Sequence, residues 1–237
     1  MTFLRTIQHA GALAAAALSL FAASPAQAQH AGFRSFTVAA EAPLTVALFF
    51  PTAVPERTVP MGPWQVVVAP GAPASEAPLK GLILVSHGTG GTELNHHDIA
   101  TRLARDGYLV AAVRHPGDNW QDRSMVTSGR YFSERPHQLS QVLDALLASP
   151  EWGTRIPVDH IGAVGHSAGG YSVLALAGGQ AEPGRAAQHC LAVQDDPGFC
   201  ALAAPATAAA ARAEPVSVPD PRIRAVVAMA PMAVVFT

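Results

Sequence analysis

The segment HIGAVGHSAGGYSVLALAGG, residues 160–179, constrains the fold more than any other part of the chain. Its first half is a short continuous apolar run, which is typical of a strand buried on both faces of a parallel sheet. Its second half predicts a helix, and a single tight turn around Ser167 separates the two. A strand that passes directly into a helix indicates βαβ units and hence a parallel sheet.

The rest of the chain repeats this alternation. Its 20 glycines and 20 prolines suit a loop-rich α/β protein better than a helical bundle. We therefore predict an α/β fold, with a mostly parallel sheet flanked by helices. Region 180–220 is rich in Ala and Pro without a clear period and predicts an inserted cap or lid. The other expected elements are edge strands within 33–53, a further short strand at 64–70, buried strands at 81–88 and 108–117, a last strand at 222–231, and helices at 95–107 and 135–150, the second with Pro136 in its first turn.

The first 28 residues predict a secretory signal peptide. Arg5 supplies a positive charge, an apolar run follows, and AQA at 26–28 is a small-residue cleavage site. The alternative, a membrane anchor, is disfavoured because the run is short for a bilayer span. We expect an exported protein, periplasmic or secreted, with no stable membrane anchor after cleavage and a mature domain of 29–237. The net charge of −2 gives no reason to expect nucleic acid as a partner.

The chain has two cysteines, Cys190 and Cys200. In an oxidising compartment such a pair predicts a disulfide that closes a surface loop. Closing so short a loop stabilises the fold by about 2–3 kcal/mol in the chain-entropy model. A zinc site that includes His189 is the weaker alternative, because the spacing does not match a usual ligand set.

Ser167 is the centre of a Gly-x-Ser-x-Gly motif between the buried strand and the helix. This is the context of a nucleophile elbow. The turn is so tight that residues two before and two after the serine approach the backbone closely, and Gly165 and Gly169 permit this. The elbow lifts the hydroxyl above the sheet and directs the Ala168 N–H toward the oxygen of a reacting carbonyl. The alternative is an ordinary glycine–serine turn without chemistry.

A second glycine-rich loop, SHGTGGT at 86–92, follows an earlier buried strand. Loops at that place supply a second donor to the oxyanion, and the N–H after the His-Gly pair belongs here to Thr89. A phosphate-binding loop is the competing interpretation. The segment lacks the lysine of a P-loop and does not match G-x-G-x-x-G, so we favour the oxyanion loop.

Three segments together, VSHGTGG, NHHDIATRLARDGYLVAAVRHPGDN and GHSAGGYSVLALAGG, resemble exported dienelactone hydrolase-like proteins, which are relatives of platelet-activating factor acetylhydrolases in the α/β-hydrolase superfamily. The resemblance covers roughly Phe36 to Pro231. It implies a serine esterase or lactonase with Ser167 as nucleophile and a small-molecule ester or lactone as substrate. Dienelactone hydrolases proper use cysteine at this position, so serine favours the esterase side of the group. No metal and no cofactor are implied.

The acid and the base that such a serine needs are expected after it, in the order Ser, Asp or Glu, His. His189 is the only histidine after Ser167, and it follows too closely and lacks a suitably placed acid. We therefore expect the chain to be truncated at its C-terminus, with the acid and the base beyond Thr237. Residues 1–237 alone should then be poorly soluble and nearly inactive, because the last strand would leave a bare edge. The acids after the serine are Glu182, Asp195, Asp196, Glu214 and Asp220.

The earlier histidines are weaker candidates. His115 and Asp118 follow a strand on the active-site side and, with His87, are candidates to line the substrate pocket. A structural role in their loops is the simpler expectation. His166 is expected to pack beneath the elbow, and His96 to lie in solvent at a helix start.

The sequence thus predicts a serine hydrolase that cleaves an ester or lactone through an acyl-enzyme. Two alternatives stay open. One is a catalytically inactive binding protein of the same fold, and the other is a peptidase of the same fold.

Overall fold

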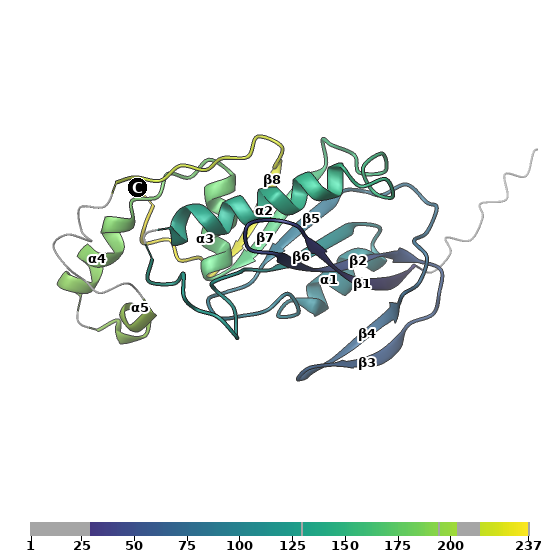
Figure 1. Ribbon diagram of the computed structural model, residues 1–237, viewed down its shortest axis with the longest axis horizontal. Coiled ribbons are helices and arrows are strands. Elements are labelled where there is room, and N and C mark those ends of the chain that lie inside the picture. Colours follow the sequence, from purple (N-terminus) through teal and green to yellow (C-terminus); the bar gives the residue numbers. More distant parts are fainter. Residues whose placement is uncertain (1–28, 129, 194, 203–213, 237) are drawn as a thin grey trace, which may run out of the picture.

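The computed structural model describes residues 29–128, 130–193, 195–202 and 214–236, so the predicted signal peptide lies outside the described residues. Its centre is an eight-stranded sheet in the order β3-β4-β1-β2-β6-β5-β7-β8 (Figure 1). The strands are β1 (His30–Val38), β2 (Leu44–Thr52), β3 (Arg57–Met61), β4 (Trp64–Pro70), β5 (Leu82–Ser86), β6 (Leu109–Arg114), β7 (Ile161–His166) and β8 (Ala225–Met229). The helices are α1 (His97–Arg105), α2 (Tyr131–Leu147), α3 (Ala168–Leu176), α4 (Pro183–Ala192) and α5 (Pro197–Leu202).

The four strands β6, β5, β7 and β8 are parallel to one another, whereas β2 pairs antiparallel with both β1 and β6. The prediction of an α/β fold with a mostly parallel central sheet is therefore confirmed. Parallel strands have their carboxyl ends at one edge of the sheet. The loops after Ser86, Arg114, His166 and Met229 consequently meet at that edge.

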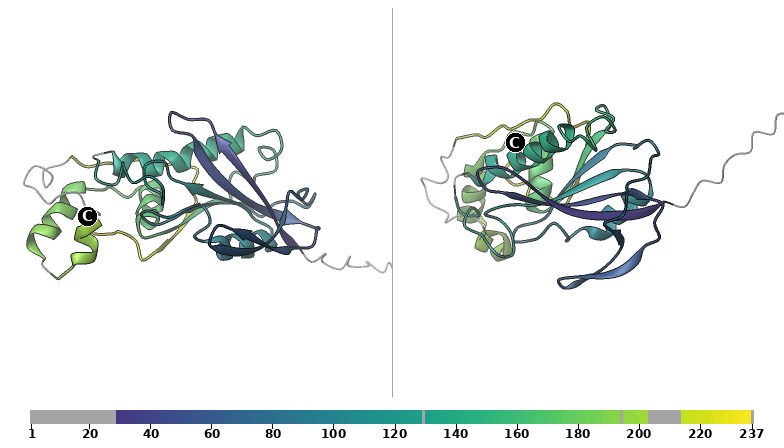
Figure 2. Two further views of the ribbon diagram at one scale, coloured as in Figure 1. Left: turned by 60° about the horizontal axis from the view of Figure 1, so that its bottom comes forward. Right: turned by 45° about the vertical axis from the view of Figure 1, so that its right-hand side comes forward.

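Both faces of β5, β6 and β7 are buried, as their continuous apolar sequences predict, whereas β8 lies at the edge of the sheet and Val227 on it is exposed. Along β6, Leu109, Ala111 and Val113 pack with the leucines of α2, while Val110 and Ala112 pack with α1 on the other face. The two views of Figure 2 keep α2 and α1 on opposite sides of the sheet. This three-layer packing fixes the ends of the strands and hence the loops they carry.

Helix α2 begins at Tyr131, so Pro136 lies inside the helix and not in its first turn as predicted. Proline has no N–H, and the carbonyl of Phe132, four residues earlier, therefore lacks its helical donor. The hydroxyl of Tyr171 in α3 donates to this carbonyl at 2.7 Å. Burial raises the pKa of Tyr171, so its hydroxyl keeps the proton that it donates. The proline thus creates an acceptor that links α2 to α3.

We expect Tyr171→Phe to lower the free energy of unfolding by about 1–2 kcal/mol, because the Phe132 carbonyl then has no donor. In a Pro136→Ala background the same change should cost less, since the backbone N–H restored at position 136 can donate to Phe132. Urea unfolding of the four proteins gives the coupling as a double-mutant cycle. Equal costs in both backgrounds would contradict this account.

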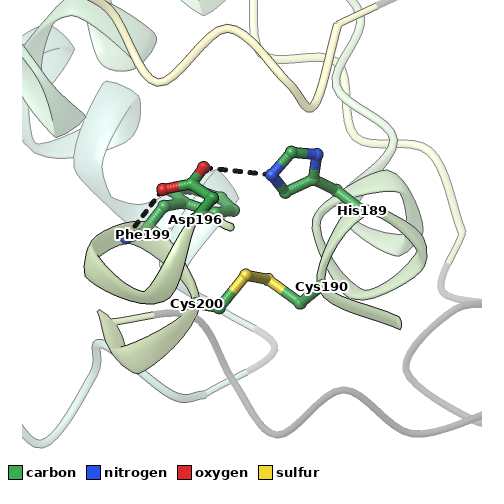
Figure 3. Close-up of a disulfide and its surroundings, with 5 residues drawn as sticks. All are labelled: His189, Cys190, Asp196, Phe199 and Cys200. Atoms are coloured by element: carbon green, nitrogen blue, oxygen red, sulfur yellow. Dashed lines mark hydrogen bonds and ion pairs between the residues drawn. A yellow bond between two sulfur atoms is a disulfide. The ribbon is translucent and has the colours of Figure 1, made fainter. Parts of the chain in front are cut away.

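The predicted cap region contains α4 and α5, which lie at the end of the molecule away from the β3–β4 hairpin; residues 203–213 lie outside the described residues. Cys190 and Cys200 form the predicted disulfide, which joins the two helices (Figure 3). Beside it, His189 Nε2 lies 3.0 Å from Asp196 Oδ2, and the imidazole packs edge-on against Phe199. With both sulfurs in the disulfide, neither cysteine offers a thiolate to zinc, which disfavours the zinc alternative.

Across the ranges that the structure describes, no helix has both the length and the apolar character needed to cross a lipid bilayer.

Candidate active site

Ser167 occupies the turn between β7 and α3, with backbone angles of φ 54° and ψ −116°. A positive φ is uncommon outside glycine and carries a strain of about 1–3 kcal/mol. Hydrogen bonds on both sides hold this conformation. The Ser167 N–H donates to the Met229 carbonyl at the end of β8, and the Ser167 carbonyl accepts from the N–H groups of Tyr171 and Met232, each at 3.0 Å. A strained serine between strand and helix is the geometry of a nucleophile elbow.

The two glycines of the motif have no room for a side chain. A Cβ on Gly165 would lie 2.0 Å from the Gly169 carbonyl oxygen, and a Cβ on Gly169 would lie 2.0 Å from the Ser86 carbonyl oxygen. The close approach predicted for both positions is confirmed. It also brings the elbow directly against β5 and the loop that follows it.

The loop after β5 lies beside Ser167. A Cβ on Gly88 would be 3.3 Å from the Cβ of Ser167. The Gly88 carbonyl accepts from the Gly91 N–H at 3.0 Å and contacts His87 Nδ1 at 2.7 Å, while the Gly90 N–H donates to Asp118 at 2.7 Å. These bonds close the loop into a compact turn against the elbow.

Thr89 and Ala168, the two predicted oxyanion donors, belong to these two adjoining turns. In the described part of the chain, neither of their backbone N–H groups donates to a protein acceptor. The Thr89 hydroxyl is held by the Tyr131 hydroxyl at 3.0 Å. Burial raises the pKa of Tyr131 to about 12, so this contact involves a neutral phenol.

His87 and His115 are almost completely buried behind the loop. His115 Nδ1 lies 2.7 Å from Gln138 Oε1 and its Nε2 lies 2.8 Å from Ser86 Oγ, while His87 Nε2 accepts from the His115 N–H at 3.2 Å. Burial, followed by the charge of Arg135, lowers the pKa of His87 to about 3 and that of His115 well below its ordinary value. Both imidazoles are therefore neutral at physiological pH.

Asp118 is also fully buried and pairs with Arg135, a residue that the sequence analysis did not single out. The three predicted pocket residues, His87, His115 and Asp118, thus lie together, with their polar atoms engaged inside the protein. Contact of these side chains with a substrate stays a prediction. Arg135 shares one face of α2 with Leu139 and Val142, a spacing that is informative only once the helix is known to start before residue 135.

Within the described residues, no imidazole nitrogen lies within hydrogen-bond distance of Ser167 Oγ. His189 pairs with Asp196 between α4 and α5. Asp220, the last acid of the chain, binds Arg222 and Ser140, and the bond from Arg222 lowers its pKa to about 2. The described residues therefore bring Ser167, Thr89 and Ala168 into adjoining turns and place no acid–base pair beside them, and the catalytic roles of the three stay predictions.

His166 is exposed at the end of β7, so the prediction that it packs beneath the elbow is wrong. Side chains alternate along a strand, and His166 falls on the face that α1 covers. There its ring stands edge-on to that of His96, with 5.7 Å between centroids. His96 is half-buried and not solvated as predicted, and burial followed by the charge of His166 lowers its pKa.

The sequence matches the model of the dienelactone hydrolase family over residues 67–213. No curated protein is similar enough in sequence to count as a relative. Among solved structures, a ferulic acid esterase from Streptomyces cinnamoneus is 24% identical, with a TM-score of 0.49 over 64% of this chain and 56% of that one. A dienelactone hydrolase from Anabaena variabilis is 17% identical, with a TM-score of 0.43 over 62% of this chain and 57% of that one.

A bacterial heroin esterase is also similar, at 17% identity, with a TM-score of 0.40 over 62% of this chain and 38% of that one. The chain thus spans little more than half the length of the first two of these solved proteins, and less of the third.

Proposed function

Since the chain belongs to the dienelactone hydrolase family, whose model matches more than half of it, we propose that the protein hydrolyses a carboxylic ester or lactone through an acyl-enzyme on Ser167. The single observation that carries this proposal is the backbone of Ser167, strained at φ 54° between β7 and α3. Strain of this kind persists only where surrounding contacts enforce it, and it is concentrated at functional sites.

In this reaction Ser167 Oγ forms a bond to the ester carbonyl carbon while its proton goes to a base. The electron pair of the carbonyl moves to its oxygen, and the N–H groups of Thr89 and Ala168 donate to that oxyanion. The intermediate collapses by expelling the alcohol, which takes up the proton, and water then releases the acid by the same route. Each oxyanion donor is worth about 3–4 kcal/mol of transition-state stabilisation.

The surroundings of the nucleophile are apolar on one side. Met125, Tyr131 and Ala168 form a buried cluster, against which Phe132 and Met232 pack. Met232 also donates its N–H to the Ser167 carbonyl, so this cluster adjoins the reacting residue. Such a surface supports a small-molecule substrate with an apolar acyl group. The disulfide between Cys190 and Cys200 supports an exported protein, periplasmic or secreted.

A fluorophosphonate probe tests the proposal on the protein as its source organism secretes it. The probe reacts with activated serines only, so we expect one labelled residue, mapped by peptide mass spectrometry to Ser167. Ser172, which lies buried one turn further along α3, is the internal control and should stay unlabelled. A protein that is folded but unlabelled would support the inactive binding protein instead. Turnover of p-nitroanilides in preference to p-nitrophenyl esters would support the peptidase.

A further inference from the structure

Arg135 is completely buried, yet it carries a charge on the apolar face of α2. A buried charge is strongly unfavourable unless it is paired and all of its donors are satisfied. Every contact of the guanidinium is therefore informative about why an arginine stands at this position.

The guanidinium reaches the oxyanion loop from behind. Nη2 donates to the His87 carbonyl and, at 3.2 Å, to Ser86 Oγ. Nη1 donates to Asp118 Oδ2 at 2.5 Å, and Nε donates to Ser172 Oγ in α3 at 3.2 Å. One planar group thus joins β5, the oxyanion loop, the loop after β6 and the helix that starts at the nucleophile.

The Asp118 carboxylate extends this connection to the far side of the loop. Its Oδ2 binds Arg135, and its Oδ1 accepts the Gly90 N–H at 2.7 Å. The backbone is therefore held directly before Gly88, at the His87 carbonyl, and directly after Thr89, at the Gly90 N–H. The N–H of Thr89 lies between these two anchors and donates to no acceptor in the described part of the chain.

We propose that Arg135, acting through Asp118, is a positioning residue that fixes the Thr89 N–H toward the oxyanion. This inference rests on the function proposed above and adds to it the group that keeps the donor preorganised. The loop needs such an anchor because Gly88, Gly90 and Gly91 offer little conformational restraint of their own. Donors stabilise a transition state best when they need no reorganisation as charge develops.

A lysine cannot replace this arginine. Its ammonium is a single point, whereas the guanidinium fork donates to Asp118 and to the His87 carbonyl from different nitrogens. Arg135→Lys keeps the charge beside Asp118 but should lose one of the two anchors.

The experiment compares the wild type with Arg135→Met/Asp118→Asn and with Arg135→Lys, each in the protein as its source organism produces it. The double variant removes both buried charges together and so avoids leaving one unpaired; the lysine variant serves if the double variant does not fold. The matched control is Arg105→Met/Glu56→Gln, which removes a two-bond ion pair at the far end of α1. Amide hydrogen exchange and steady-state kinetics are measured on each protein.

We expect amide exchange in the 87–91 peptide to speed up at least about tenfold in both Arg135 variants and to stay unchanged in the control. The kcat for p-nitrophenyl acetate should fall about 10- to 100-fold, with KM nearly constant, because the lost contact acts in the transition state. Unchanged exchange in 87–91 would overturn the inference.

Faster exchange with an unchanged kcat would likewise overturn the link to the oxyanion. If the wild type hydrolyses no ester, the proposed function fails, and the exchange result still decides whether Arg135 holds the loop.

Discussion

Ser167→Ala is expected to lower kcat/KM for p-nitrophenyl acetate by about four orders of magnitude or more, with the fold intact. Removal of a catalytic serine leaves only the rate enhancement that comes from substrate binding and from the oxyanion donors. The side chain is half-buried and the backbone strain resides in the turn, so loss of the hydroxyl disturbs little packing. Steady-state kinetics on the protein as its source organism produces it measure the effect.

Ser35→Ala is the matched control, because Ser35 is exposed on β1, away from the carboxyl edge of the parallel strands. Its kcat/KM should equal that of the wild type. Thermal unfolding of both variants verifies that the fold is retained. Ser167→Ala with more than a few per cent of wild-type activity would refute the acyl-enzyme route.

The parallel sheet and the elbow could be predicted because their signals are local. Strands β5, β6 and β7 are short apolar runs with residues buried on both faces, and β8 is a short apolar run at the edge of the sheet. Each lies within a stretch predicted as a strand. The elbow depends on a few neighbouring residues, whose small size is needed within a single turn. The signal for each strand and for the elbow is therefore contained in a single segment of sequence.

Arg135 could not be found in the same way. A helix predicted to start at residue 135 places this arginine at its first position, where an arginine ordinarily points to solvent. The helix starts at Tyr131, so Arg135 lies a full turn inside and on the leucine face. Its partners, His87, Asp118 and Ser172, come from three distant segments. These segments come together because of the order of the strands in the sheet. The alternation of strands and helices along the sequence does not determine that order.

The same error in the helix start concealed the role of Pro136. At a first turn its missing N–H would have had no consequence. Inside α2 it leaves the Phe132 carbonyl without a helical donor, and the Tyr171 hydroxyl of α3, 39 residues after Phe132, donates to that carbonyl instead. Local sequence patterns thus predict the ends of helices poorly, because tertiary contacts decide where a helix begins.

The neutral imidazole of His87 leads to the second large effect, on stability at acid pH. Its pKa is about 3 in the folded protein and about 6.5 when unfolded. The unfolded state therefore binds the proton more readily, so the stabilisation is complete above pH 6.5 and is lost progressively as the pH falls toward 3. Between pH 7.5 and 4.5 the free energy of unfolding should fall by about 3 kcal/mol from this residue alone. The lowered pKa of His115 likewise makes the protein less stable as the pH falls.

Urea unfolding at pH 7.5 and 4.5 measures this loss in the wild type and in His87→Asn. The variant is expected to be less stable at pH 7.5, because it loses the contact from the His115 N–H. Its loss of stability between the two pH values should be smaller by about 3 kcal/mol. His137→Asn, an exposed histidine of α2, is the control and should follow the wild type.

Protonation of Asp220 contributes little to the loss of stability between pH 7.5 and 4.5. Its pKa of about 2 lies below an ordinary carboxyl value, so its contribution is lost only as the pH falls below about 4. Identical pH dependence in His87→Asn and in the wild type would mean that this imidazole titrates normally in the folded state. The buried network behind the 86–92 loop would then be open to water, and a water-excluded anchor for that loop by Arg135 and Asp118 would have to be abandoned.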